Sequence, residues 1–162
     1  MNLLAIDPGS TDSAYVVIDQ DSLKPLAFKK VPNEQLLMQC YSMADAKLVD
    51  GAAIETVASY GMAVGASVFD TCWWAGRFHE ALASGGMKAE RIFRREVKLH
   101  ICGQARAKDA NIRMALVDRF GGGASNGGKG SKGSPGFFYG FSADVWQAYA
   151  LGVYVAEVTF KS

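Results

Sequence analysis

Two acidic residues each close a short apolar run: Asp7 follows residues 3–6 (LLAI) and Glu55 follows residues 51–54 (GAAI). Short apolar runs bounded by turn residues are typical of buried strands. A carboxylate at the end of a buried strand is costly to keep ionised unless donors or a cation lie beside it. If the two strands are neighbours, both carboxylates reach one sheet edge and repel each other unless a positive group, usually a divalent ion, lies between them. The pair therefore predicts a cation site.

Each of these acids also has a structural interpretation. Asp7 begins the sequence DPGST at residues 7–11, and aspartate before Pro-Gly commonly caps local amides in a turn. A third acid, Asp144, follows Ser142 in the first turn of the predicted last helix, where the helix dipole favours an anion. The same position would bring the carboxylate of Asp144 to the strand ends, and the occurrence of Asp7 and Glu55 in similar settings favours a shared site.

The elements that must position these acids follow from turn residues and apolar periodicity. Strands are expected at residues 2–6, 14–19 and 25–30, as an antiparallel meander, and at 52–55 and 89–93. Helices are expected at residues 33–49 (capped by Asn33), 66–83, 107–120 and from 142 past Tyr154, with a helical turn at 94–100. In the second helix we expect a set of apolar and small residues to face the core, while Trp74, Arg77 and His79 serve other surfaces. That inward set is Val68, Phe69, Cys72, Trp73, Gly76 and Leu82.

Residues 121–136 differ from the rest of the chain. Eight of them are Gly, and Lys129 and Lys132 lie among them. A segment with so few apolar side chains cannot offset its ordering entropy by burial, so we expect a mobile loop. It is either a flexible linker or a basic flap that becomes ordered on nucleic acid.

Composition limits the class of protein. The chain has 162 residues, 49% of them hydrophobic, which predicts one domain over residues 1–162 with its own core. No apolar stretch is long enough to span a bilayer, so no membrane association is expected, and the N-terminus lacks a basic leader. Three widely spaced cysteines fit reduced thiols in the cytoplasm, the host cytoplasm for a phage-encoded chain.

Charge is unevenly distributed although the net charge is only +1. Residues 1–87 carry 5 basic and 10 acidic side chains, whereas residues 88–162 carry 12 basic and 6 acidic ones. A protein that holds a polyanion on a basic surface and cuts it at an acidic metal site requires such a division of charge. The alternative is that the charges are solvated helix faces.

The order of these features resembles the ribonuclease-H-like nucleases, and within them the RuvC-type Holliday-junction resolvases, in particular their short phage-type relatives. The segments that carry the resemblance are residues 5–10 (AIDPGS), 53–55 (AIE), 103–112 (GQARAKDANI) and 142–150 (SADVWQAYA). It implies an α/β fold with a five-stranded mixed sheet flanked by helices, and a homodimer. It also implies cleavage of four-way DNA junctions with Mg²⁺ or Mn²⁺, two ions per active site.

The resemblance assigns Asp7 and Glu55 as the first two metal ligands, with Asp7 bridging both ions and Glu55 and Asp144 on one each. The resemblance implies two ligands three residues apart on the last helix, and two alignments are possible. In one, Asp144 is the first ligand and Gln147 the second, whose carbonyl oxygen would coordinate a metal or hold a water. In the other, Asp144 is the second ligand and Phe141 takes the first position. Asp109 is a further candidate for the metal ligand that either alignment lacks. Lys108 matches a basic position near the scissile phosphate.

The basic half of the chain supplies candidates for DNA contact, which would position the backbone rather than read bases. They are Arg94, Arg95, Lys98, Arg106, Lys108, Arg113 and Arg119, with Lys129 and Lys132 on the loop. Tyr60 and Met62 follow Glu55 and are candidate wedges at an opened crossover, with a core role as the alternative. Trp73 and Trp74 are candidates for the dimer interface, where aromatics are enriched.

Three other functions remain open at this stage. The sequence DPGST also fits the Asp-x-Gly-x-Thr pattern of actin-like ATPases, which need two such domains. A non-catalytic junction-binding module of the same fold is favoured by Gln147. A related nuclease acting on RNA–DNA hybrids or other branched DNA uses the same residues.

Overall fold

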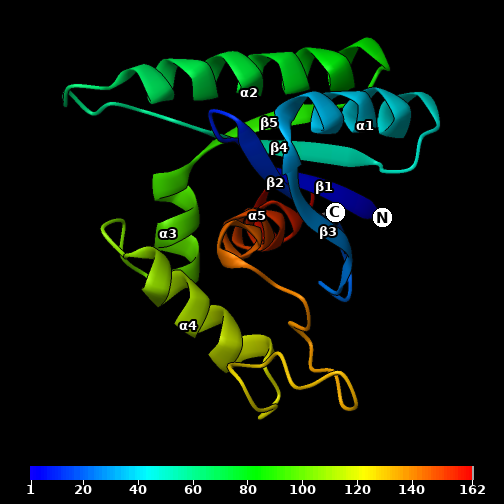
Figure 1. The fold of residues 1–162 in the computed structure, drawn as a ribbon, viewed down its shortest axis with the longest axis vertical. Helices are drawn as coiled ribbons and strands as arrows, with labels where there is room; N and C mark the ends of the chain where they lie inside the picture. Colours follow the sequence, from blue (N-terminus) through cyan, green and yellow to red (C-terminus); the bar gives the residue numbers. More distant parts are fainter. Residues whose placement is uncertain (162) are drawn as a thin grey trace.

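The computed structural model describes residues 1–161 and is built on a mixed five-stranded sheet (Figure 1). The strands run in the order β3-β2-β1-β4-β5. Their bounds are β1 Asn2–Asp7, β2 Asp12–Asp19, β3 Pro25–Pro32, β4 Gly51–Thr56 and β5 Ala89–Phe93. β1, β2 and β3 pair antiparallel, as the expected meander requires, whereas β4 and β5 run parallel to β1. The expected five-stranded mixed α/β fold is confirmed.

The helices cover both faces of this sheet (Figure 1). Their bounds are α1 Asn33–Asp45, α2 Ala66–Ser84, α3 Arg94–Cys102, α4 Asp109–Phe120 and α5 Ala143–Tyr154, which continues as the π-helix η1, Val155–Thr159. Side chains alternate along β1, so Leu3 and Ala5 join the core beneath α5, and Leu4 and Ile6 join the core beneath α1 and α2. The sheet thus separates two apolar cores.

Helix α5 is the most deeply buried helix in the described chain. Nine consecutive residues, 145–153, are buried, so it is apolar all round, as a central helix must be. Phe138 and Phe141, which precede it, pack on Trp146 and Tyr149 with ring centroids 4.5–5.6 Å apart. This aromatic cluster fixes where α5 begins, and therefore where Asp144 stands.

The structure differs from the sequence prediction at the end of α1, at the caps of α1 and α5, and in the length of α3. Helix α1 ends at Asp45 instead of residue 49, because Lys47 adopts a left-handed conformation (φ 51°) and the amide of Leu48 bonds back to the carbonyl of Met43 at 3.0 Å. Asn33 and Ser142 stand at the starts of α1 and α5, but neither side chain caps its helix. Residues 94–100, expected as a single turn, belong to the nine-residue helix α3.

The predicted inward face of α2 was wrong for four residues that are exposed, Phe69, Cys72, Trp73 and Gly76, and right for Leu82, which is fully buried. Phe69 and Trp73 are 65% and 71% exposed, and Cys72 is exposed too, whereas Phe78 is fully buried and Trp74 packs partly against the same core. Helix α2 carries two adjacent apolar stripes, each with aromatic residues four positions apart. Periodicity alone could not decide which stripe faces the sheet.

Residues 121–136 form turns held by backbone hydrogen bonds. The amide of Gly130 donates to the carbonyl of Ser125 at 2.9 Å, and the amide of Gly136 donates to that of Lys129 at 2.8 Å. The backbone approaches itself so closely that a Cβ on Gly130 would lie 2.3 Å from the carbonyl oxygen of Ser134. Glycine therefore allows this compact path, and the mobility of the loop stays a prediction.

The remaining findings on the fold concern membrane-spanning helices and the cysteines. Among residues 1–161, no helix is both long enough and apolar enough to cross a membrane. Cys40, Cys72 and Cys102 are all free thiols.

The orientation of α2 can be tested by two substitutions on that helix. Phe78→Ala should lower the free energy of unfolding by about 3–5 kcal/mol, because it leaves a cavity in the core. Phe69→Ala should change the free energy of unfolding of the monomer by less than about 0.5 kcal/mol, since that ring is mostly exposed within a single chain. Chemical denaturation measures both; equal losses would contradict the orientation described here.

Candidate metal site and nucleic-acid interface

Strands β1 and β4 bring Asp7 and Glu55 side by side. The parallel register pairs Ile6 with Ile54, so each carboxylate follows directly after the last paired residue of its strand. Alternation along β1 places Asp7 on the same face as Leu3 and Ala5, beneath α5. Glu55 is only 6% exposed. The predicted juxtaposition of the two acids at one sheet edge is therefore present.

These two carboxylates lie in an electrostatically unfavourable place. Burial raises the pKa of Asp7 well above its usual value, and the neighbouring charge of Glu55 adds to the effect. Burial also raises the pKa of Glu55, although Arg94 opposes that effect. Within residues 1–161, no side chain or amide forms a hydrogen bond or ion pair with the Asp7 carboxylate. Asp7 is thus a half-buried acid with no direct hydrogen-bond or ion-pair partner among residues 1–161, although the nearby charge of Arg94 partly opposes the rise in its pKa.

A buried polar network, not anticipated from the sequence, holds the turn after Asp7. Asn33 donates its side-chain amide to the carbonyl of Gly9 at 3.0 Å and accepts from the hydroxyl of Ser13 at 2.6 Å. The Ser13 oxygen accepts in turn from the Gly9 amide at 3.0 Å. Ser13 and Asn33 are each 1% exposed. This network replaces the helix-capping role predicted for Asn33, and its only sequence signal is a polar residue directly after Val31-Pro32.

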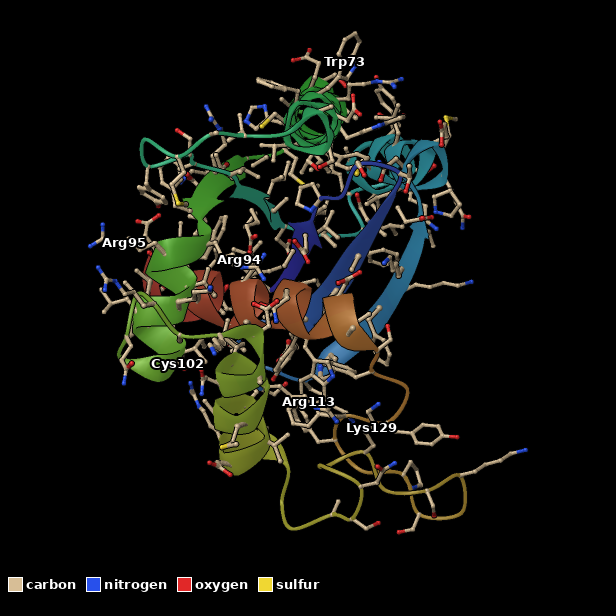
Figure 2. The ribbon with its side chains drawn as sticks, turned by 60° about the vertical axis from the view of Figure 1, so that its left-hand side comes forward. Trp73, Arg94, Arg95, Cys102, Arg113 and Lys129 are labelled. Atoms are coloured by element: carbon tan, nitrogen blue, oxygen red, sulfur yellow. The ribbon has the colours of Figure 1, made fainter. Side chains whose placement is uncertain are left out.

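Two basic side chains compensate the acids. Arg94 donates from Nη1 to Oε1 of Glu55 at 3.2 Å and from Nη2 to Oδ1 of Asp109 at 2.7 Å. Lys30 on β3 forms an ion pair with Asp144, which raises the pKa of the lysine. Arg94, which is labelled in Figure 2, forms these ion pairs within the acidic site, and its contact with DNA stays a prediction.

Asp7 and Asp144 line one cleft of about 320 Å³, together with Lys30 and Arg94. Among residues 1–161, no group of three or more His, Cys, Asp or Glu side chains is arranged to hold a metal ion. Two of the candidate ligands pair instead with basic side chains, Glu55 with Arg94 and Asp144 with Lys30. Gln147, one turn along α5 from Asp144, is 5% exposed.

A second cleft, of about 280 Å³, begins at Glu55 and has apolar and basic walls. Tyr60 and Met62, which are 61% and 70% exposed, form its apolar part, and Arg95 and Lys98 form its basic part. The exposure of Tyr60 and Met62 removes the core role that was their alternative interpretation.

The remaining basic candidates fall into two groups. Arg106, Lys108 and Lys132 are exposed and Lys129 is half-buried. Arg113 stacks over the Trp146 ring at 5.1 Å, and Arg119 pairs with Glu157 on η1. Arg119 is thus engaged within the fold. Arg95, Arg113 and Lys129 are labelled on the faces of α3, α4 and the loop in Figure 2.

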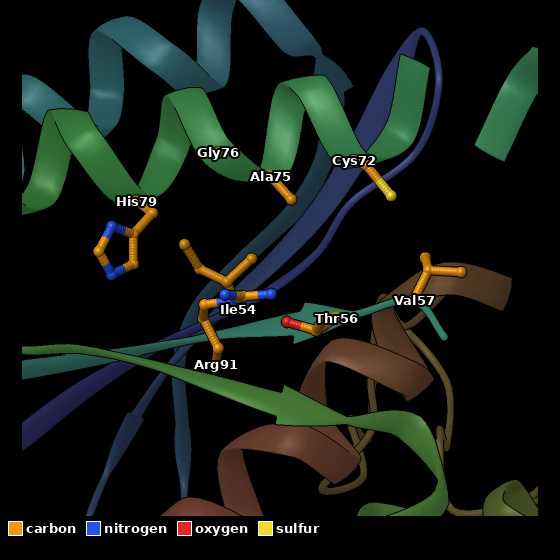
Figure 3. Close-up of a pocket in the computed structure, with 8 residues that line it drawn as sticks. All are labelled: Ile54, Thr56, Val57, Cys72, Ala75, Gly76, His79 and Arg91. Carbon is orange, nitrogen blue, oxygen red and sulfur yellow. The ribbon is translucent and has the colours of Figure 1, made fainter. Parts of the chain in front are cut away.

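A third cleft, not predicted from the sequence, lies away from the carboxylates. Its volume is about 300 Å³, between α2 and the strands β4 and β5. Cys72 and His79 line it from α2, and Thr56 and Arg91 line it from the strands (Figure 3).

No protein-family model and no curated protein sequence matches this chain. Among solved structures, RuvC from Thermus thermophilus is similar with a TM-score of 0.70 at 16% identity, covering 96% of this chain and 93% of that one. A structure of T. thermophilus RuvC in complex with a Holliday junction substrate matches with a TM-score of 0.65 at 17% identity and the same coverage. The chain has the RuvC fold. The expected ribonuclease-H-like architecture is confirmed, and at this identity the likeness to RuvC concerns the fold alone.

The charge of Asp7 should destabilise the protein when no metal is present. Because folding raises the pKa of Asp7, the folded protein binds a proton more tightly than the unfolded chain, so stability falls as pH rises from about 3.9 to the raised pKa. Asp7→Asn removes this penalty. In EDTA at pH 7–8 it should raise the unfolding temperature by about 2–4 °C for each kcal/mol relieved, and the gain should shrink below about pH 4.

The matched control is Asp21→Asn, which removes an exposed acid from the β2–β3 turn and should leave the unfolding temperature unchanged. Thermal unfolding across pH measures both variants. A lower unfolding temperature for Asp7→Asn at neutral pH would show that the Asp7 carboxylate is a turn former rather than an uncompensated charge.

Proposed function

We propose that this chain is a metal-dependent, structure-selective endodeoxyribonuclease that cleaves Holliday junctions and other branched DNA by phosphodiester hydrolysis. The observation that carries the proposal is the Asp7–Glu55 pair on adjacent parallel strands: Glu55 is buried, Asp7 is half-buried, and within residues 1–161 no hydrogen bond or ion pair is made to the Asp7 carboxylate. An enzyme keeps such an unfavourable pair when a ligand compensates it.

The donor set fits Mg²⁺ or Mn²⁺. Asp7, Glu55 and Asp144 offer only carboxylate oxygens, which hard divalent cations prefer. Two bound ions would supply an activated water and neutralise charge on the phosphate and the leaving oxygen. In this proposal Asp7 bridges the ions, Glu55 and Asp144 each hold one, and the amide oxygen of Gln147 coordinates or orients a water.

The surface beside this site fits a branched polyanion. Arg95 and Lys98 flank Glu55, and Tyr60 and Met62 project beside them to enter an opened crossover. The other phosphate contacts are assigned to Arg106, Lys108, Arg113, Lys129 and Lys132, with Lys108 near the scissile phosphate. The RuvC structure that contains a Holliday junction substrate supports this choice of DNA.

Cleavage of synthetic substrates tests the activity. The parent should nick a four-way junction in Mg²⁺ or Mn²⁺, nick a three-way junction, and leave plain duplex and RNA–DNA hybrid largely intact. Asp7→Asn should lower the rate by more than about a hundredfold, since even outer partners of metal ligands typically contribute 10–100-fold. Denaturing gels measure both, with Asp21→Asn as the control that should cut like the parent.

A non-catalytic junction-binding module is the second candidate. It is favoured by Gln147 at a usual acidic position and by the lack, within residues 1–161, of a carboxylate group ready to hold metal. A parent that binds junctions as tightly as Asp7→Asn, yet cuts nothing in either ion, would establish this candidate. The actin-like ATPase needs a second domain of this type, and the strands of residues 1–161 form only the one sheet.

We also propose that the chain forms a homodimer through the outer faces of α1 and α2. Phe69 and Trp73 on α2 are more than 60% exposed, Met38 and Tyr41 on α1 are exposed beside them, and the two helices pack together. Trp73 projects outward in Figure 2. Contiguous exposed aromatic and Met side chains are typical of protein interfaces.

Sedimentation equilibrium tests the dimer. Trp73→Ser should weaken association by at least about tenfold, because large buried aromatics dominate interface energies. Met114→Ser, which removes a 63% exposed side chain from α4, should leave it unchanged. A monomeric parent, or equal effects of the two substitutions, would contradict this interface.

A further inference from the structure

Arg94 stands where the acidic site meets α3. It is the first residue of that helix, directly after β5, and the Glu96 carboxylate accepts from the Phe93 amide at 3.0 Å. This local bond fixes the start of α3, so the backbone of Arg94 is held at the sheet edge next to β4. Its side chain is therefore delivered to the carboxylates by the fold and not by chance surface pairing.

The two ion pairs of Arg94 differ in burial. The side chain of Glu55 is 7% exposed, that of Asp109 is 61% exposed, and that of Arg94 itself is 37% exposed. A buried carboxylate depends strongly on its counter-ion, whereas an exposed one is solvated and loses little when a pair breaks. Arg94 thus links a buried carboxylate, Glu55, which depends on it for charge compensation, to an exposed carboxylate, Asp109, which only holds the arginine side chain in place.

The carboxylates around Arg94 explain why a positive charge is needed at this place. Asp7 and Asp144 line the same cleft as the guanidinium, and Glu55 lines the adjoining one. A divalent ion bound between Asp7 and Glu55 would meet the Arg94 charge at close range and repel it. Both cations cannot neutralise Glu55 at once.

We propose that Arg94 is an internal counter-ion of the metal-free protein, which competes with divalent ions for Glu55 and is retained at the edge of the site by Asp109 when a metal displaces it. This rests on the metal site of the proposed function. Arg94 then acts as a positioning residue: its ion pair holds the Glu55 side chain in place before the metal binds. After displacement, its planar guanidinium still has edges free for a phosphate, which a lysine would not present in the same way.

Lys30 provides an internal comparison. Its pair with Asp144 joins side chains that are 47% and 43% exposed, so solvent already screens it. The competition with metal is accordingly assigned to Arg94 and not to basic residues at the site in general.

Mn²⁺ binding to the DNA-free protein tests the proposal without any activity assay. Arg94→Gln should bind Mn²⁺ about tenfold more tightly than the parent, because a competing unit charge is gone. Lys24→Gln, which changes net charge equally at an exposed position between β2 and β3, should bind like the parent. Electron paramagnetic resonance of free Mn²⁺ during titration gives each dissociation constant.

Stability in EDTA provides the second measurement and covers the risk that Arg94→Gln folds poorly. Arg94→Gln should lower the unfolding temperature, and the double variant Arg94→Gln/Glu55→Gln should recover most of that loss, since no buried charge then lacks a partner. Arg94→Lys, which keeps the charge but cannot span both carboxylates, should bind Mn²⁺ with intermediate affinity.

The outcomes separate the two proposals. If the parent binds Mn²⁺ and Arg94→Gln or Arg94→Lys binds no more tightly, the competition is refuted while the metal site stands. If the parent binds no Mn²⁺ at millimolar concentration, both fail together. If the double variant is no more stable than Arg94→Gln, Arg94 is not the counter-ion of Glu55.

Discussion

Two carboxyl groups held side by side at a largely enclosed sheet edge are the constraint on which this structure depends. Parallel pairing of β1 with β4 sets Asp7 next to Glu55, and the core beneath α5 removes much of their solvent. Neither carboxylate can leave, because each ends a strand whose other residues are packed on both faces. The surroundings must supply positive charge, and the positions of Arg94 and Lys30 are explained by that requirement.

The rest of the fold makes this edge rigid. Helix α5 is enclosed along nine residues, so Asp144 at its first turn has a fixed height above the sheet. The Ser13–Asn33 network fixes the turn after Asp7 from the opposite side. Preorganisation of this kind means that ligands need only replace counter-ions, while the backbone stays in place. The Asp7 carboxylate lowers the free energy of unfolding, and the apolar burial in the two cores offsets this loss.

Local sequence patterns were enough to find the strands and the acids. Asp7 and Glu55 each end a short apolar run, and Asp144 follows a helix-start signal, so nearest-neighbour chemistry decides their positions. The ion pairs of Arg94 were not predicted, because its partners, Glu55 and Asp109, are 39 and 15 residues away. The face of α2 and the role of Asn33 failed for the same reason: contacts distant in sequence chose between locally equivalent alternatives.

The compact glycine turns of residues 121–136 lead into α5 through Phe137 and Phe138, which are already stacked in the aromatic cluster. The turns are tied to this cluster as well, because the amide of Phe138 donates to the carbonyl of Gly128 at 3.1 Å. The path of the glycine-rich segment and the position of Asp144 are therefore linked through one aromatic residue.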